Sequence, residues 1–281
     1  MANREQDPSN CTHDCSTCSA NCGSRQAPEK AVLKEDSKIG KTIAVISGKG
    51  GVGKTMISCL LASELNKKGY KVSILDADMT GPSVPKNFGL NDMCLMADDG
   101  GILPVETENG IKAVSVNLML EDASQPVIWR GPVIAGTLVG FYQDTHWGNN
   151  DYLIIDCPPG TGDVPLTIFQ QIKIDGIIVV TTPQDLVSLI VSKAVNMAKM
   201  MNIPIIGIVE NMSYIKCPDC GKKISLFGQG YTKVMSQEYD IPVLAHMPLD
   251  PEMTAKVDMG QVEFVTPNEE FAQVVKAVEE V

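Results

Sequence analysis

The chain has 281 residues, and 44% of them are hydrophobic, which is enough for one large α/β domain with a full core. The 34 acidic residues outnumber the 23 basic ones and give a formal net charge of −11, which argues against nucleic acid or an anionic membrane surface as the main partner. Because no stretch approaches the roughly 20 apolar residues that span a bilayer and the first residues are polar rather than an apolar signal segment, we expect a cytoplasmic protein that binds neither nucleic acid nor membranes.

Residues 1–37 form a polar, cysteine-rich segment that is predicted to be a disordered, flexible tail without a core of its own. Four of the nine cysteines lie in it: Cys11, Cys15, Cys18 and Cys22. A cytoplasmic location disfavours a disulfide framework, whereas four thiols in so short a segment make a credible tetrathiolate metal site. The spacing alone does not choose between an iron–sulfur cluster and zinc, and it leaves open that the tail binds neither.

Strand and helix patterns alternate through residues 38–281, which predicts one α/β domain with a mostly parallel sheet and helices on both faces. Near-continuous apolar runs predict strands at 41–47, 71–76, 152–156, 176–181, 204–209 and 242–246. Helical spacing predicts helices at 56–65, 132–143, 186–201, 229–238 and 268–280. Short strands are expected near 102–105 and 111–116.

The segment Gly48–Thr55 reads Gly-Lys-Gly-Gly-Val-Gly-Lys-Thr and meets the P-loop pattern Gly-x4-Gly-Lys-Ser/Thr between a predicted strand and a predicted helix. The glycines let backbone N–H groups face phosphate oxygens, and the helix N-terminus adds partial positive charge. Lys54 is expected to reach the β- and γ-phosphates, and the Thr55 hydroxyl to bind Mg²⁺. The predicted ATP-binding residues are Gly48, Lys49, Gly50, Gly51, Val52, Gly53, Lys54, Thr55 and Met56.

Aspartates end two of the predicted strands. Asp156 ends an apolar run in the manner of a Walker B strand, where an acid holds the Mg²⁺ shell through water. Asp76 and Asp78 follow another strand, and Asp163 closes the loop after Asp156. A single aspartate at a strand end is more often a helix cap or turn former. Because ligands of open parallel sheets bind at the carboxyl ends of strands, we expect these four to converge on the phosphates.

The pair Cys217 and Cys220 lies in a loop after the fifth strand and places two thiolates on one tight turn. Two ligands are too few for a stable metal site, but a symmetric dimer supplies two more. Half of a zinc ribbon and a redox dithiol are the alternatives. Cys59 and Cys94 are expected to be ordinary small apolar residues, and Cys157 a structural one.

The string Gly48–Thr55 resembles the deviant Walker A motif of the MinD, ParA and nitrogenase iron protein class, because it carries an early lysine, Lys49, in addition to Lys54. In that class the early lysine crosses a dimer interface and touches the partner's nucleotide. The resemblance implies an ATP-dependent dimer in which Lys49 acts in trans. It also implies that Asp78 positions the attacking water, so that Lys49, Lys54 and Asp78 are the expected catalytic residues.

A longer set of motifs is similar to the Mrp/ApbC family of iron–sulfur carrier P-loop ATPases over about residues 38–281. The motifs are, in order, Gly48–Thr55, Asp76–Ser83, Trp129–Pro132, Asp156–Asp163, Val209–Met212 and the Cys217/Cys220 pair. The resemblance implies a homodimer that holds a bridging [4Fe–4S] cluster on two CxxC pairs, passes it to apo iron–sulfur proteins and hydrolyses ATP slowly. It also implies that Asn211 contacts the adenine. The N-terminal cysteines are more tightly spaced here than in the eukaryotic scaffold members.

Three other functions share parts of this pattern. A positioning ATPase of the MinD/ParA kind needs a basic membrane- or DNA-binding surface, whereas segment 269–281 is short and acidic. A nitrogenase-type electron donor is expected to have separated cluster ligands rather than a CxxC pair. A dimer held by structural zinc is the third alternative, in particular for a protein purified in air.

Overall fold

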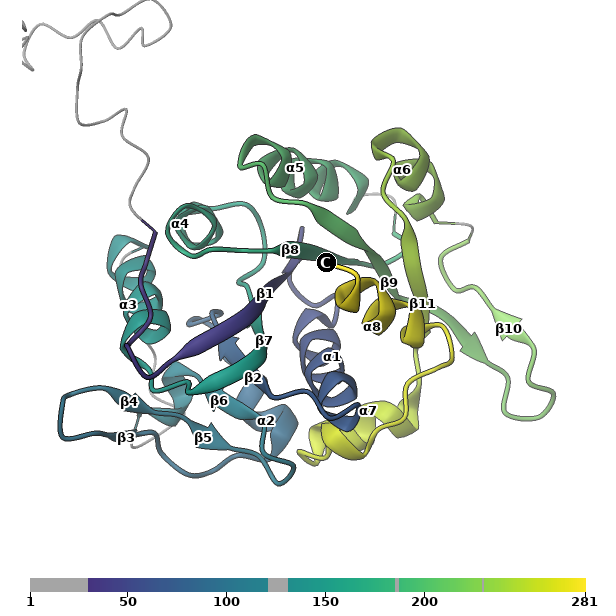
Figure 1. Ribbon diagram of the computed structural model, residues 1–281. Coiled ribbons are helices and arrows are strands. Elements are labelled where there is room, and N and C mark those ends of the chain that lie inside the picture. The colour runs from purple at the N-terminus through teal and green to yellow at the C-terminus, as the bar shows by residue number, and fades with distance from the viewer. Residues whose placement is uncertain (1–29, 121–130, 185–186, 229) are drawn as a thin grey trace, which may run out of the picture.

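The computed structural model describes residues 30–120, 131–184, 187–228 and 230–281 (Figure 1). The predicted tail ligands Cys11, Cys15, Cys18 and Cys22 lie outside the described residues. Within the described part of the chain, no helix is both long enough and apolar enough to cross a membrane.

The described residues form a central sheet of nine strands, most of which are parallel. The strand order is β10 (Lys223–Ile224), β9 (Ile205–Lys216), β8 (Gly176–Thr181), β1 (Lys38–Ser47), β7 (Asn149–Asp156), β2 (Val72–Asp76), β6 (Lys112–Val114) and β5 (Val105–Glu106). The ninth strand, β11 (Val243–Pro248), also pairs with β9 and is parallel to it, whereas β10 and β5 are antiparallel edge strands. A separate small hairpin joins β3 (Leu95–Met96) to β4 (Ile102–Leu103).

Helices cover both faces of the sheet (Figure 1). One face carries α1 (Lys54–Lys67), α2 (Val84–Phe88), α7 (Pro251–Asp258) and α8 (Phe271–Glu279). The other face carries α3 (Gly131–Asp144), α4 (Asp163–Gln171), α5 (Val187–Met200) and α6 (Thr232–Tyr239). Two 3₁₀ turns, Val116–Leu118 and Val262–Phe264, complete the described elements.

Strand β1 shows how the sequence builds this three-layer arrangement. Ile43 and Val45 pack into the core under α1, whereas Ala44 and Ile46 pack into the core under α3. Successive side chains of a strand point to opposite faces of the sheet. A strand covered by helices on both sides therefore reads as a continuous apolar run.

The predicted fold, a mostly parallel α/β sheet of the P-loop NTPase type, is confirmed. Three of the helices in the described residues are missing from the sequence-based prediction: α2, α4 and α7. Strand β9 continues to Lys216 rather than ending at residue 209, because β11 and then β10 pair with its second half.

Residues 30–37, the described end of the predicted tail, lie against the domain. Lys30 Nζ donates to the carbonyl oxygens of Phe169 and Ile172 at 2.9 Å each, at the C-terminal end of α4. Ala31 N donates to Gln171 O at 2.6 Å, and Leu33 packs on the core beside α3 and α4. We call residues 30–37 the arm.

Candidate functional site: a nucleotide cavity and a thiol turn

The glycine loop between β1 and α1 has the backbone that a phosphate cradle needs. Gly51 and Gly53 adopt positive φ angles of 77° and 79°, in the left-handed region that favours glycine. A Cβ built on Gly53 would overlap the side-chain amide of Asn211. Among the described residues, no side chain caps the N-terminus of α1, and its first turn holds no acidic residue. The first N–H groups of α1 therefore remain available to an anion.

Asp156, at the end of β7, is the acceptor on which three side chains of α1 converge. Its side chain is 0% exposed, and it accepts hydrogen bonds from three side chains of α1. Lys54 Nζ lies 2.7 Å from Oδ1, Ser58 Oγ lies 2.7 Å from Oδ1, and Thr55 Oγ1 lies 2.6 Å from Oδ2. Lys54 and Thr55, the residues predicted to bind phosphate and Mg²⁺, thus both donate hydrogen bonds to the Asp156 carboxylate.

The charge of Lys54 is retained although its side chain is only 6% exposed. Burial by itself lowers the pKa of Lys54, but the adjacent Asp156 carboxylate outweighs it, so that the pKa is raised overall. A buried cation next to a cavity and held by one carboxylate is suited to bind an anionic ligand.

Asp76 organises the loop that follows β2 and does not line the cavity. Its Oδ2 accepts from Ser83 N at 3.1 Å, Val84 N at 3.2 Å and Ser115 Oγ at 3.1 Å. In the sheet it lies opposite Asp156. Burial, together with the charge of Asp156, raises the pKa of Asp76 to about 7. Asp76 therefore anchors the start of α2, and the role of a direct phosphate contact falls to other residues.

Asp78 is half-buried and does line the cavity, and its Oδ1 accepts from Thr80 Oγ1 at 3.0 Å. Asp163 is exposed in the first turn of α4 and is not part of the cavity wall. Of the four aspartates predicted to converge, the structure brings Asp76 and Asp156 together beneath the cavity and Asp78 to its wall.

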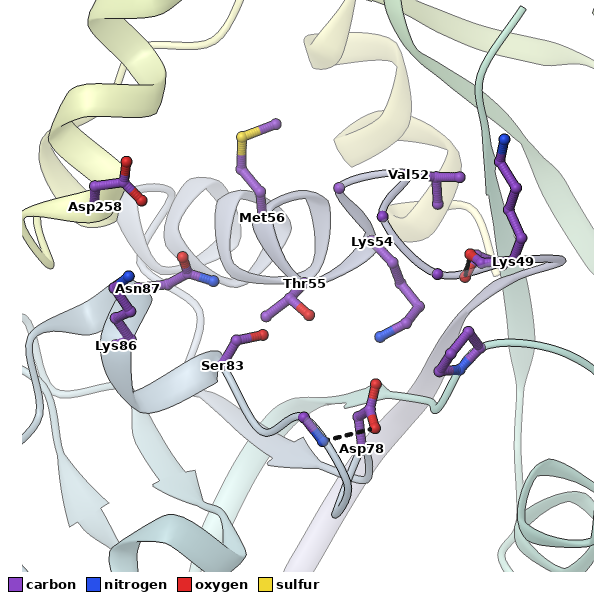
Figure 2. Close-up of a pocket in the computed structure, with 16 residues that line it drawn as sticks. Lys49, Val52, Lys54, Thr55, Met56, Asp78, Ser83, Lys86, Asn87 and Asp258 are labelled. Atoms are coloured by element: carbon purple, nitrogen blue, oxygen red, sulfur yellow. Dashed lines mark hydrogen bonds between the residues drawn. The ribbon is translucent and has the colours of Figure 1, made fainter. Parts of the chain in front are cut away.

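The cavity has a volume of about 360 Å³, and Figure 2 shows Lys54 and Thr55 pointing into the space that Asp78 faces. Its wall comprises Ser47, Lys49, Gly50, Gly51, Val52, Gly53, Lys54, Thr55, Met56, Asp78, Gly81, Ser83, Lys86, Asn87, Pro159 and Asp258. The sequence placed Ser83 in a motif without giving it a role at the site, and it gave no sign of Lys86 and Asn87, because α2 has only five residues, too few for a helical pattern. The usable signal was the helix-starting Ser83-Val-Pro85 that follows the Asp76-x-Asp78 strand end.

Lys49 and Asn211 each tie the glycine loop to another part of the chain. Lys49 is half-buried, and its Nζ donates to Gln184 Oε1 of the same chain. Asn211 is buried on β9, and its Nδ2 donates to Val52 O at 2.9 Å. Its Oδ1 is buried without a hydrogen-bond partner among the described residues. Asn211 thus ties β9 to the glycine loop and retains one unused acceptor.

The two thiols of the CxxC pair lie on the turn that joins β9 to β10. Cys217 N donates to Lys222 O at 3.0 Å, and Gly221 N donates to Cys217 O at 2.9 Å. Backbone N–H groups of Cys220 and Asp219 point at the Cys217 sulfur and lower its pKa, and the Cys220 side chain adds to this. Cys217 is half-buried and Cys220 is exposed. The turn therefore favours thiolate at an accessible position, as a soft metal requires.

The remaining described cysteines differ from Cys217, because burial raises their pKa values instead of lowering them. Cys59 and Cys157 are fully buried, and burial raises the pKa of Cys157 to about 12 and that of Cys59 well above its usual value. Cys94 is half-buried, and burial raises its pKa as well. Within the described residues, no group of three or more His, Cys, Asp or Glu side chains is arranged to hold a metal ion. One copy of the described chain brings two thiols to the turn.

Comparison with known proteins agrees with this geometry. The family model of the ParA type described as "NUBPL iron-transfer P-loop NTPase" matches residues 38–281. Proteins named "Iron-sulfur cluster carrier protein" are similar over most of their length. The one from Clostridium perfringens is 43% identical over 89% of this chain and 90% of its own, and the one from Methanocaldococcus jannaschii is 44% identical over 96% and 97%.

Solved structures show the same fold. A nucleotide-binding protein from Archaeoglobus fulgidus, described as complexed with ADP and with Co found, is 43% identical over 82% of this chain and 90% of its own, with a TM-score of 0.73. MinD from Pyrococcus horikoshii, at 21% identity and a TM-score of 0.58 over 86% of this chain and 96% of its own, shares the fold. The chain therefore belongs to the ParA-type family of NUBPL-like iron-transfer P-loop NTPases.

Proposed function

We propose that the protein is an ATP-binding and ATP-hydrolysing iron–sulfur cluster carrier or scaffold. It works as a homodimer that assembles a [4Fe–4S] cluster between two CxxC turns and transfers it to apo iron–sulfur proteins. The observation that carries the proposal is the union, in one chain, of a P-loop cavity with an accessible thiol turn whose Cys217 has a lowered pKa. The names of the relatives, iron–sulfur cluster carrier proteins, support the same cargo.

The residues around the cavity suit ATP and Mg²⁺. In the proposed complex, Lys54 and the loop N–H groups hold the phosphates, Thr55 and Asp156 hold Mg²⁺, and Asp78 orients the attacking water. Mg²⁺ would supply neutralisation of the phosphate charge. Asn211 would use its free Oδ1 toward the adenine.

The second lysine acts between subunits in this proposal. Lys49 is held by Gln184 in the single chain and would leave that partner to reach the nucleotide of the facing subunit. Such a contact adds positive charge where the transition state gains negative charge. ATP binding and dimer geometry are thereby linked.

Strand β9 offers a physical connection between the glycine loop and the thiol turn. Asn211 on this strand bonds the glycine loop, and Cys217 follows six residues later, directly after the strand ends at Lys216. At about 3.3 Å per residue a fully extended path would separate the two positions by roughly 20 Å, and the left-handed backbone of Met212, with a φ of 54°, makes the actual path shorter. A shift of the loop on nucleotide binding would therefore be passed along a single strand to the thiol turn.

The cluster assignment is tested by the double variant Cys217→Ser/Cys220→Ser. After anaerobic reconstitution with iron and sulfide, we expect the variant to lose the visible charge-transfer band and the iron that the wild type binds at the dimer interface. The experiment is done in a chain whose Cys11, Cys15, Cys18 and Cys22 are also replaced by serine, so that tail thiols cannot contribute iron.

Cys94→Ser is the matched control, because Cys94 is a single half-buried thiol away from the turn. Iron per dimer that is the same in the double variant and in this control would overturn the proposal. Zinc measured in the same samples distinguishes iron–sulfur binding from a structural zinc site.

A further inference from the structure

Ser58 is a buried polar residue of α1 that belongs to none of the recognised nucleotide motifs. Its side chain is 0% exposed. Its Oγ lies 2.7 Å from Asp156 Oδ1 and 3.1 Å from Lys54 O. A hydroxyl has one proton to donate. Of the two acceptors the carboxylate is the stronger, so the bond to Asp156 is the one expected to hold that proton.

Three side chains donate hydrogen bonds to Asp156 in this structure, and they differ in whether they can also contact a bound nucleotide or Mg²⁺. Lys54 and Thr55 are the residues that turn to the phosphates and to Mg²⁺ in the proposed function. Ser58 sits one helical turn behind Lys54 and is fully enclosed, so it has no ligand to turn to. It is the donor that stays on the carboxylate when the other two leave.

We infer that Ser58 is a positioning residue for Mg²⁺: its hydroxyl holds Oδ1 of Asp156 so that Oδ2 keeps facing the metal shell after Lys54 and Thr55 have moved to the nucleotide. The inference rests on the proposed Mg–nucleotide site. Donors behind a metal-binding carboxylate orient it, and their loss commonly costs about 10–100-fold in metal affinity.

The chain contains a matched control on the same helix. Ser63 is 2% exposed, and its Oγ donates to Cys59 O at 2.8 Å, the same four-residue backbone contact that Ser58 makes with Lys54 O. Among the described residues, Ser63 Oγ has no hydrogen bond to a carboxylate. Ser58→Ala and Ser63→Ala therefore each remove one buried hydroxyl from α1, but only Ser58→Ala removes a hydrogen-bond donor to Asp156.

The experiment titrates MgCl₂ into the full-length protein with a fluorescent ADP analogue and measures the Mg²⁺ concentration that gives half of the Mg²⁺-dependent binding signal. We expect Ser58→Ala to raise this concentration by about tenfold, and Ser63→Ala to leave it unchanged. Binding of the analogue in EDTA should be the same for all three proteins. Ser58→Thr, which keeps the hydroxyl, should restore the wild-type Mg²⁺ requirement.

The outcomes separate this inference from the proposed function. A wild type that shows no Mg²⁺-dependent binding of the analogue would overturn the proposed nucleotide site, and this inference with it. A wild type that shows it, with Ser58→Ala titrating like the wild type, would overturn the role of Ser58 alone. Thermal melts of both alanine variants check folding. If Ser58→Ala does not fold, Ser58→Cys, with a weak donor of similar size, is titrated under the same criterion.

Discussion

Gly53 is the residue of the glycine loop that packs closely against Asn211 of β9. Its φ of 79° is strained for any other residue, and an added Cβ would overlap the Asn211 amide that holds the loop to β9. We expect backbone strain to lower the free energy of unfolding of Gly53→Ala by about 1–3 kcal/mol, and the overlap with Asn211 to lower it further. The variant should also lose its affinity for ADP. Urea unfolding and binding of a fluorescent ADP analogue measure the two effects.

Gly69→Ala is the control for backbone strain. Gly69 has a φ of 95°, and a Cβ built on it meets nothing within 4 Å. It should therefore lose stability through strain alone and keep its affinity for ADP. Equal losses of stability in the two variants, with ADP binding intact in both, would contradict the role given to the Gly53–Asn211 contact.

Lys49 carries the prediction that two subunits share their nucleotides. Lys49→Ala should depress ATP turnover on the order of 10³-fold, the scale of charge contacts made in the transition state of phosphoryl transfer. It should leave nucleotide binding by its own subunit largely intact, because Lys54 remains on the cavity wall. Steady-state ATPase assays and nucleotide titrations separate these two quantities.

Gln184→Ala tests the other half of this argument. It removes the acceptor that holds Lys49 within its own chain and leaves the lysine free to cross the interface. Its turnover is expected to match or exceed that of the wild type. Wild-type turnover in Lys49→Ala would refute the trans role.

The motif residues of the cavity could be predicted from the sequence because a phosphate cradle imposes a local pattern. Gly48–Thr55 had to be contiguous for the loop to wrap one phosphate group. Asp76 and Ser58 could not be assigned in this way. Whether a strand-end aspartate faces a ligand or caps the next helix depends on the position of α2, and a serine within a helix has no pattern of its own. Their partners lie 7 and 98 residues away along the chain.

At the scale of elements, strand β9 shows where an apolar pattern misleads. The Ile/Val run stops before Glu210, and the sequence therefore predicts a strand end there. The strand continues because β11 pairs with it through Tyr214 and β10 through Lys216. Helices α4 and α7 were missed because each is short and has a proline in its first turn, Pro165 and Pro251, which sequence reasoning reads more readily as a break. Long-range pairing, which no local window contains, decides these elements.

The arm is fastened by a charged cluster that joins three elements. His146, which precedes β7, has its Nδ1 2.6 Å from Asp36 of the arm and its Nε2 3.0 Å from Asp99 in the β3–β4 hairpin. Lys34 of the arm also pairs with Asp99, at 2.7 Å, and Asp144 of α3 adds a weaker field at that lysine. The hydrogen bonds to Asp36 and Asp99 raise the pKa of His146. The contact with His146 lowers the pKa of Asp36, whereas the pKa of Asp99 is lowered first by Lys34 and then by Gly101 N and His146.

The sign of the pH dependence follows from these directions. Because the folded pKa of His146 is raised, its contribution is fully present below about pH 6.5, the unfolded value, and is lost as pH rises through the folded pKa. The carboxyls contribute above their unfolded values and lose that contribution only in acid. We expect the protection of residues 30–37 against proteolysis, or against amide exchange measured relative to the intrinsic rate at each pH, to fall as pH rises above about 6.5, while the sheet stays protected.

His146→Gln should remove this pH response and leave the arm loosely held throughout. His246→Gln is the control, because His246 pairs with Glu270 and is not part of the cluster that holds the arm. An arm that is equally protected from pH 6 to 9 in the wild type would rule out the clamp.

The molecule as a whole is acidic, yet the thiol turn is locally basic. Against a net charge of −11, the exposed residues around Cys217 and Cys220 include Lys216, Lys222 and Lys223, against one exposed acid in the turn, Asp219. Lys223 also lies 3.7 Å from Glu270, so Lys216 and Lys222 supply most of the local positive charge. Two copies that meet at this turn bring their lysines together, and like charges at close range oppose association. An iron–sulfur cluster on four thiolates is anionic and would offset this repulsion.

Assembly is therefore expected to depend on what is bound. In oxygen-free buffer with saturating ATP, MgCl₂, iron and sulfide, sedimentation should show a dimer of the 30.2 kDa chain. After the iron is removed by chelation, the dimer should dissociate more readily. Raising the salt concentration should then partly restore association of the iron-free chain, because added ions screen the facing lysines. Cys217→Ser/Cys220→Ser should behave like the chelated protein at every salt concentration, since it lacks the thiolates that retain the anionic centre. A chain that stays monomeric when nucleotide, iron and sulfide are all supplied would show that the thiol turns do not meet, and would leave each Cys217/Cys220 pair with two ligands for a centre that needs four.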